Sequence, residues 1–193
     1  MIFVAFSLQE ENTSPRADES AKARALLASL HEHIWGEVCP TLEKDCYGKP
    51  FFVGSKKQLS ISHSYGAVAV AISDSDCPIG VDIENTVSPK RAARVGARFP
   101  FVKERRFREL NEITLLFAKR KGDGFSFEKV CLAPVKDNCF TSVWTLTEAI
   151  LKADGGGFAS AKNLDKLEFI TEASAFKIDN FYLSTAKITD KCK

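Results

Sequence analysis

Cysteines are few and scattered in this chain, and they form neither a C-x-x-C pair nor a His-linked spacing of the kind that binds zinc. Six cysteines in 193 residues are too sparse for a disulfide framework, so free thiols in a reducing cytoplasm are expected. Long apolar runs are also lacking, and none approaches the ~20 residues that a membrane span needs. The apolar residues 1–8 have no basic leader or cleavage pattern, so we expect a first strand there and not a signal peptide.

The overall composition is that of an ordinary soluble globular protein, with 45% hydrophobic and 27% charged residues. A length of 193 residues fits one large domain, or two small halves that share a core.

The formal charge of +2 hides a strong asymmetry. The segment from Lys90 to Lys121 contains eleven basic and three acidic residues, a formal charge of +8 against −6 for the rest of the chain. A positive segment of this size favours an acidic partner, either nucleic acid or an acidic protein. A solvated helix face would have the same composition.

Strands and helices are expected to alternate along the chain, in an order that suggests two related halves near 1–98 and 99–193. A polar loop is expected at 9–16, and residues 125–138 are read as a loop or a short strand pair. Ser88 and Pro89 form a typical helix start, with an N-cap serine and proline in the first turn. Strands are predicted at 1–8, 59–64, 67–73, 79–84, 166–171 and 181–188, and helices at 18–34, from 89, at 102–119 and at 140–152.

Two carboxylates stand two residues apart in the predicted strand 79–84, in the sequence Gly-Val-Asp-Ile-Glu. Alternate residues of a strand share a face, so Asp82 and Glu84 point one way while Val81 and Ile83 point into a core. Two carboxylates this close repel each other unless a cation lies between them, and Mg²⁺ prefers such oxygen ligands. The same spacing also occurs on solvated strand faces.

The predicted helix at 140–152 carries Trp144, Glu148 and Lys152 four residues apart, and therefore on one face. They are either a surface ion pair beside a core tryptophan, or a third metal carboxylate with a phosphate-binding lysine. His63 lies between two serines at the end of the predicted strand 59–64, where all three side chains are able to donate hydrogen bonds to a phosphate.

Taken together and in order, these motifs resemble those of 4′-phosphopantetheinyl transferases, in particular the larger, monomeric surfactin-synthetase-activating type. The Ala23–Leu27 stretch and the Arg98-Phe99 pair also look like parts of that family, so the resemblance runs from Arg24 to about Gly157. The motifs are Gly48-Lys49-Pro50, Ile61-Ser62-His63-Ser64, Gly80-Val81-Asp82-Ile83-Glu84 and Trp144-Thr145-Leu146-Thr147-Glu148-Ala149-Ile150-Leu151-Lys152.

The resemblance implies an α+β fold of two pseudo-twofold-related halves, each a small antiparallel sheet packed with helix, with coenzyme A in the cleft between them. It implies transfer of phosphopantetheine to a serine of a carrier protein, with release of 3′,5′-ADP. The positions matching Asp82, Glu84 and Glu148 would hold Mg²⁺, and Glu148 and Lys152 would be catalytic. The positions that would contact coenzyme A are Arg24, Lys49, Pro50, Ser62 and His63.

The resemblance also implies a monomer that acts on an acidic carrier protein, which suits the basic segment better than nucleic acid does. No groove-reading or aromatic-interleaved motif supports nucleic acid, and no membrane association is expected.

One position departs from the family pattern. The family has lysine directly before the motif's glutamate, where this chain has Thr147. Loss of a charge-assisted phosphate contact costs about 1.5–3 kcal/mol. The alternative hypothesis is therefore a non-catalytic relative that binds carrier proteins or coenzyme A.

Overall fold

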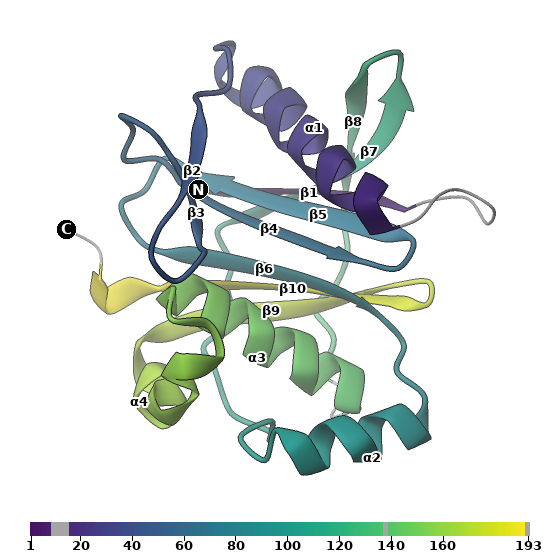
Figure 1. The fold of residues 1–193 in the computed structure, drawn as a ribbon, viewed down its shortest axis with the longest axis vertical. Coiled ribbons are helices and arrows are strands. Elements are labelled where there is room, and N and C mark those ends of the chain that lie inside the picture. The colour runs from purple at the N-terminus through teal and green to yellow at the C-terminus, as the bar shows by residue number, and fades with distance from the viewer. Residues whose placement is uncertain (9–15, 137–138, 192–193) are drawn as a thin grey trace.

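The computed structural model describes residues 1–8, 16–136 and 139–191 and has a mixed α+β architecture (Figure 1). Its larger sheet has the strand order β4-β5-β1-β7-β8, in which β1 and β7 are parallel and the other neighbours antiparallel. The predicted α+β class is confirmed. The strands of this sheet are β1 Ile2–Leu8, β4 Gln58–Ser64, β5 Ala67–Ser73, β7 Ile113–Lys121 and β8 Gly124–Val130.

A second, antiparallel sheet has the order β6-β10-β9 and packs against the first. Its register places Asp82 of β6 opposite Ser184 of β10. A small separate hairpin pairs β2 with β3. These strands are β6 Ile79–Asn85, β9 Thr171–Ile178, β10 Phe181–Ile188, β2 Leu42–Lys44 and β3 Pro50–Phe52.

Strand β5 is buried on both faces, which explains its unbroken apolar sequence. Ala67, Ala69 and Ala71 face the core between the two sheets, where they join Val81 and Ile83 of β6. The small alanine side chains allow β6 to pack closely. The larger residues of the opposite face join the core beneath α1, and they are Val68, Val70 and Ile72.

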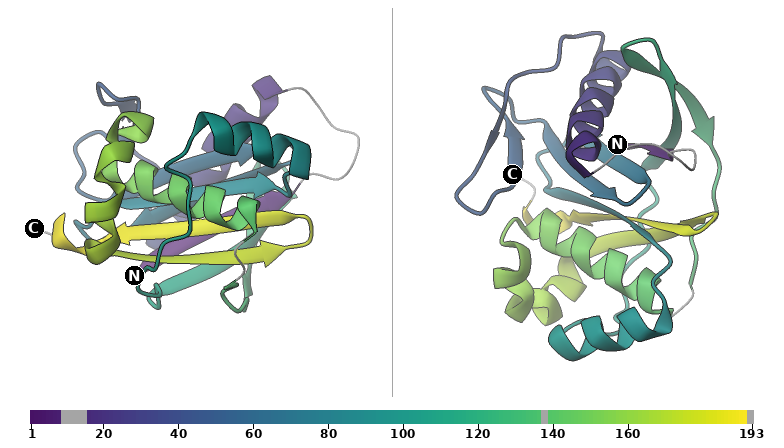
Figure 2. Two further views of the ribbon diagram at one scale, coloured as in Figure 1. Left: turned by 90° about the horizontal axis from the view of Figure 1, so that it is seen from below. Right: turned by 45° about the vertical axis from the view of Figure 1, so that its right-hand side comes forward.

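The described residues form four α-helices. Helix α1 covers the outer face of the larger sheet, with Leu26, Leu27 and Leu30 fully buried, and α3 lies along β6 and β10 (Figures 1 and 2). The helices predicted at 18–34, from 89 and at 140–152 are confirmed. They are α1 Arg16–Trp35, α2 Pro89–Arg98, α3 Phe140–Asp154 and α4 Leu164–Leu167, with 3₁₀ turns at Gly157–Asn163, Glu168–Ile170 and Thr189–Lys191.

Helix α3 reaches β6 at a position where only glycine fits. A Cβ atom on Gly80 would overlap the carbonyl oxygen of Ala149 and fall 2.6 Å from the backbone nitrogen of Ala153. The missing side chain therefore lets the helix backbone rest directly on the strand that carries Asp82.

The helix predicted over 102–119 is wrong. Residues 102–112 are largely irregular, with one isolated bridge between Arg108 and Glu172, and 113–121 form β7. The apolar spacing there fits a helix, but β7 gains backbone hydrogen bonds from β1 on one side and β8 on the other. Such tertiary pairing overrides local periodicity.

Two neighbouring expectations also need adjustment. The strand predicted at 166–171 is wrong, because Leu164 and Leu167 pack at helical spacing against α3, and β9 begins only at Thr171. Within 125–138, β8 extends to Val130 and pairs with β7, and residues 131–136 are irregular, so the described residues of this stretch hold one strand and not a strand pair. Residues 137 and 138 lie outside the described residues, as does most of the loop expected at 9–16.

The cysteines differ in one respect from the expectation of free thiols. Cys77 is disulfide-bonded, so the expectation is wrong for that residue. The thiols of Cys39, Cys46, Cys131 and Cys139 are free.

Both larger sheets take strands from either side of residue 98, so the two stretches 1–98 and 99–193 interlock. Their assignment as two related halves stays a prediction. None of the helices in the described parts of the chain is long and apolar enough to cross a membrane.

Candidate active site

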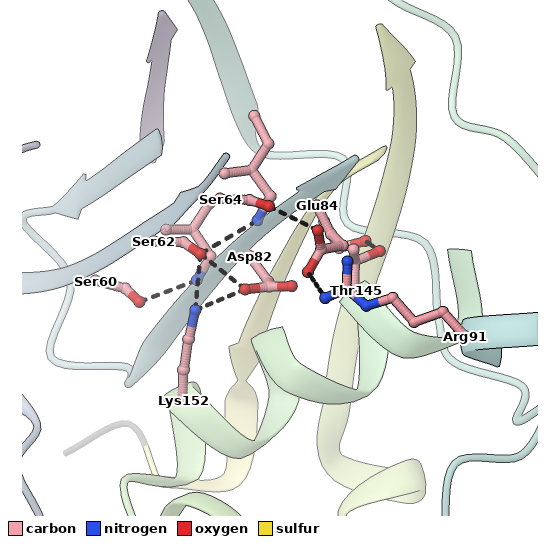
Figure 3. A network of polar contacts seen from close by, with 11 residues as sticks. Ser60, Ser62, Ser64, Asp82, Glu84, Arg91, Thr145 and Lys152 are labelled. Atoms are coloured by element: carbon pink, nitrogen blue, oxygen red, sulfur yellow. Dashed lines mark hydrogen bonds and ion pairs between the residues drawn. The ribbon is translucent and has the colours of Figure 1, made fainter. Parts of the chain in front are cut away.

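Asp82 and Glu84 lie where β6 passes α3 (Figure 3), and the carboxylate of Glu148 interacts electrostatically with both. Asp82 and Glu84 share one face of β6, as the alternation predicts, and Val81 and Ile83 are buried on the other. Glu148 comes from α3, within range of the charges of both. The sequence motifs around 82 and 148 therefore converge in space.

Asp82 is the most enclosed of the three, with 6% of its surface exposed. The ammonium of Lys152 donates to its Oδ1 at 2.7 Å, and the hydroxyl of Ser62 donates to the same oxygen at 2.7 Å. Lys152 also donates to Ser62 Oγ at 2.9 Å. These three side chains form a closed triangle in which the aspartate charge is neutralised.

Glu84 lies one pleat further along β6 and is half-buried. Its Oε1 accepts hydrogen bonds from Ser64 Oγ at 2.6 Å and from the backbone nitrogen of Asn85 at 3.1 Å. Its Oε2 lies 3.6 Å from a guanidinium nitrogen of Arg91, in the first turn of α2.

The pKa of Glu148 reflects its burial and the charges around it. Burial raises the pKa of its carboxyl group, the charge of Asp82 raises it further, Lys152 opposes these effects and Glu84 adds to them, giving a pKa of about 7. A site that resists another negative charge in this way favours a cation. Its donors are carboxylate oxygens, which suit Mg²⁺.

The side chains are not pre-assembled as ligands. Among the described residues, no three His, Cys, Asp or Glu side chains stand together as a metal site. Asp82 is bound to Lys152, and Glu84 faces Arg91. The donor chemistry of Asp82, Glu84 and Glu148 fits a hard cation, and their metal assignment stays a prediction.

His63 lies at the rim of an adjoining hollow of about 540 Å³. Its Nδ1 is 3.4 Å from the carboxylate of Glu19, which is 4% exposed and also accepts from the backbone nitrogen of Gly66 at 3.2 Å. The hollow reaches Glu84 and Arg91, so it joins His63 to the carboxylate cluster.

Lys49 and Pro50 lie at the other end of α3. The Lys49 ammonium donates to the carbonyl oxygen of Ala153 at 2.9 Å, and both residues line a hollow of about 250 Å³. Arg24 is exposed on α1, which also carries Glu19. The roles assigned to Lys49, Pro50, Arg24, Ser62 and His63 stay predictions, and the one proton of Ser62 is committed to Asp82.

Thr147 belongs to a different surface of α3. It is buried, donates to the carbonyl oxygen of Val143 at 2.7 Å, and lines a cavity of about 440 Å³ with Leu146 and Ala175 of β9. Its hydroxyl is used within the helix.

The sequence interpretation missed several supporting residues. Glu19 holds His63 and the turn at Gly66, Arg91 faces Glu84, and Ser60 binds the backbone of β6. The sequence predicts Ser64 as a donor to phosphate, whereas in the structure its hydroxyl donates to Glu84. The serines had a visible signal, because they alternate with apolar residues along β4 and must share one face.

The basic segment 90–121 is not one surface. Its first part forms α2, whereas Lys119, Arg120 and Lys121 lie on the β7–β8 hairpin at the opposite end of the molecule (Figure 1). The Arg105 side chain is 5% exposed, and its guanidinium binds Asp165 and the carbonyl oxygen of Phe101. The basic residues of the segment are therefore divided between separate surfaces, and its role in docking an acidic partner stays a prediction.

Comparison with known proteins agrees with this geometry. The search of curated proteins finds no match. The family model for the 4′-phosphopantetheinyl transferase superfamily matches residues 78–191, which include Asp82, Glu84, Glu148 and Lys152 but not β4. The match covers more than half of the chain, and the chain belongs to the 4′-phosphopantetheinyl transferase superfamily.

Proposed function

We propose that this protein transfers the 4′-phosphopantetheine group of coenzyme A to a serine hydroxyl of a carrier protein, with release of 3′,5′-ADP. Membership of the family supports a phosphopantetheinyl transferase. The observation that carries the proposal is the convergence of Glu148 with Asp82 and Glu84: burial, together with the charges of these two carboxylates, raises the Glu148 pKa to about 7. Such a cluster suits phosphoryl transfer, which requires positioning and charge neutralisation.

Asp82, Glu84 and Glu148 would hold Mg²⁺. When bound, the ion supplies positive charge for the pyrophosphate of coenzyme A and for the three carboxylates. The all-oxygen donor set is consistent with this assignment.

The protein's own side chains account for the remaining steps. A bond forms between the carrier serine oxygen and the phosphorus of the phosphopantetheine group, and the bond from this phosphorus to 3′,5′-ADP breaks. The carboxylate of Glu148, which lies near Asp82, Glu84 and Lys152, would take up the serine proton. Lys152 lies beside Asp82 and is placed to bind the phosphate chain.

Coenzyme A would extend from Lys49 and Pro50, at the C-terminal end of α3, to the hollow at His63, with Arg24 as a further phosphate contact. His63 supports this direction because it is exposed, and because Glu19 holds its ring at the rim. Ser62 is less able to donate a hydrogen bond to coenzyme A, since its hydroxyl already donates to Asp82.

The acidic carrier protein would dock on α2 and not on the whole segment 90–121. This helix buries no residue, contains four basic residues and no acidic one, and reaches the site through Arg91 and Glu84. Charge complementarity of this kind chiefly raises the association rate.

We further propose that the protein is a cytoplasmic monomer of the surfactin-synthetase-activating type.

Thr147 was the basis of the non-catalytic alternative. Its side chain lines a cavity shared with β9, and its hydroxyl bonds within α3. This position supports an active transferase, because the threonine does not interrupt the carboxylate cluster.

Intact mass spectrometry tests the proposal directly. Apo carrier proteins are incubated with coenzyme A, Mg²⁺ and the protein, and we expect a mass gain of one phosphopantetheine. Asp82→Asn removes the charge without changing the shape and should abolish the gain, whereas Glu128→Gln, in an exposed pair with Lys119, should retain it. If carrier proteins from fatty acid, polyketide and peptide synthesis all fail to gain this mass, the proposed activity is refuted.

A further inference from the structure

Strands β4 and β6 belong to different sheets, yet they lie side by side and are joined by three alternate serines (Figure 3). Ser60 Oγ accepts from the backbone nitrogen of Val81 at 3.0 Å, and Ser62 Oγ accepts from that of Ile83 at 3.3 Å. The serine hydroxyls thus take the place that carbonyl oxygens of a neighbouring strand would occupy.

The three serines differ in what else they bind. Among the described residues, Ser60 bonds only with the backbone of β6, whereas Ser62 donates to Oδ1 of Asp82 at 2.7 Å and Ser64 donates to Oε1 of Glu84 at 2.6 Å. A hydroxyl has a single proton to donate. The protons of Ser62 and Ser64 are therefore both spent on the two carboxylates of β6.

Each of these bonds fixes one named oxygen of a carboxylate. Asp82 receives both Ser62 and Lys152 on Oδ1, and Glu84 receives both Ser64 and the backbone nitrogen of Asn85 on Oε1. Restraining one oxygen restrains the plane of the group and hence the direction of the other oxygen. Side chains held in this way lose less conformational entropy when they bind a ligand.

We propose that Ser62 and Ser64 are positioning residues that orient Asp82 and Glu84 for the divalent cation. The proposal rests on the function proposed above, and it gives Ser62 a role other than contact with coenzyme A. Residues that support metal ligands typically change metal affinity 10- to 100-fold when they are removed. Ser60 provides a matched control, because it joins the same two strands without touching a carboxylate.

The experiment measures binding of Mn²⁺, an ion that takes the same oxygen ligands as Mg²⁺. Free Mn²⁺ is counted by electron paramagnetic resonance in the presence of the full-length protein alone. The variants are Ser60→Ala, Ser62→Ala, Ser64→Ala and Ser64→Thr, and circular dichroism confirms that each is folded.

We expect Ser62→Ala and Ser64→Ala to weaken Mn²⁺ binding roughly 10- to 100-fold. Ser64→Thr keeps the hydroxyl in a strand that accepts a β-branched residue, so it should bind within about threefold of the unmodified protein. Ser60→Ala should leave the affinity unchanged while lowering thermal stability, since Val81 loses its acceptor.

Unchanged affinity in both Ser62→Ala and Ser64→Ala would overturn the proposal while leaving the metal assignment intact. An equal loss in Ser60→Ala would also overturn it, because the serines would then act only by joining the strands. Absence of Mn²⁺ binding by the unmodified protein would instead refute the metal assignment, and the positioning role with it. Ser64 is only partly buried, so its two variants decide the question even if Ser62→Ala does not fold.

Discussion

The Nζ atom of Lys152 lies 2.7 Å from Oδ1 of Asp82, and the two side chains are 29% and 8% exposed. The ammonium of Lys152 and a divalent cation would therefore compete for the carboxylate of Asp82. Lys152→Met should lower the free energy of unfolding in EDTA by about 1–3 kcal/mol, because the buried Asp82 loses its cationic partner and keeps only the hydrogen bond from Ser62. Mg²⁺ should restore much of this loss and bind more tightly than to the unmodified protein.

Denaturant titrations with EDTA or Mg²⁺ would measure both effects. Lys119→Met serves as the control, since Lys119 forms an exposed pair with Glu128 at 3.0 Å and should change stability by less than about 1 kcal/mol. If Mg²⁺ leaves the deficit of Lys152→Met unchanged, the lysine and the ion do not share Asp82.

The carboxyl group of Glu148 should make stability depend on pH. Its pKa is raised from 4.5 to about 7 in the folded protein, so the folded state holds a proton that the unfolded state releases. The contribution of this group to the free energy of unfolding is largest below about pH 4.5. It falls as the pH rises to about 7 and is constant above that. Glu148→Gln should remove this fall and be relatively more stable above neutrality. Urea unfolding of both proteins between pH 4.5 and 8 gives the comparison, and parallel pH profiles would contradict the prediction.

Gly80→Ala should separate the two elements that form the site. The new Cβ would overlap Ala149 on the α3 backbone, which cannot move aside as a flexible side chain would. We expect a loss of about 3 kcal/mol in stability and a loss of transfer. Gly96→Ala is the control, since its Cβ would meet only Phe140 at 3.6 Å and alanine favours helix by about 1 kcal/mol. Thermal denaturation that finds both variants equally stable would show that α3 adjusts.

Local sequence patterns are sufficient for the elements that the site needs. The alternation around Asp82 and Glu84 predicts β6, and the spacing of Trp144, Glu148 and Lys152 predicts one face of α3. Local patterns do not predict strand β7, because it is stabilised by pairing with β1, a contact between residues more than a hundred positions apart. Local patterns also do not predict the triangle of Asp82, Ser62 and Lys152, since its three residues come from three separate elements.

Thr147 should tolerate removal of its hydroxyl group. Thr147→Val keeps the shape and loses only a hydrogen bond to Val143, so kcat for phosphopantetheine transfer should stay within about twofold. Stopped assays with a carrier protein that the unmodified enzyme accepts would measure this. A large loss of kcat in a folded variant would mean that the threonine acts on the substrate after all.

Charge reversal on α2 should weaken carrier binding selectively. Lys90→Glu combined with Arg94→Glu reverses two exposed charges beside the site, whereas Lys119→Glu with Arg120→Glu makes the same change on the distant β7–β8 hairpin. The α2 pair should lower carrier affinity at least tenfold, with a smaller effect at high salt, and leave coenzyme A affinity unchanged. Calorimetry with each ligand would show this, and equal losses from the two pairs would exclude α2 as the docking surface.

The pairing of β6 with β10 has a consequence for how the molecule is made. Strand β6 ends at Asn85, but its hydrogen-bonded neighbour begins at Phe181, close to the end of the chain. During synthesis, the strand bearing Asp82 therefore leaves the ribosome long before its partner exists. Contacts of such long range form slowly and leave strand edges open meanwhile. A nascent chain that ends before Phe181 lacks this partner, so the chemistry should become available only after β10 has been translated.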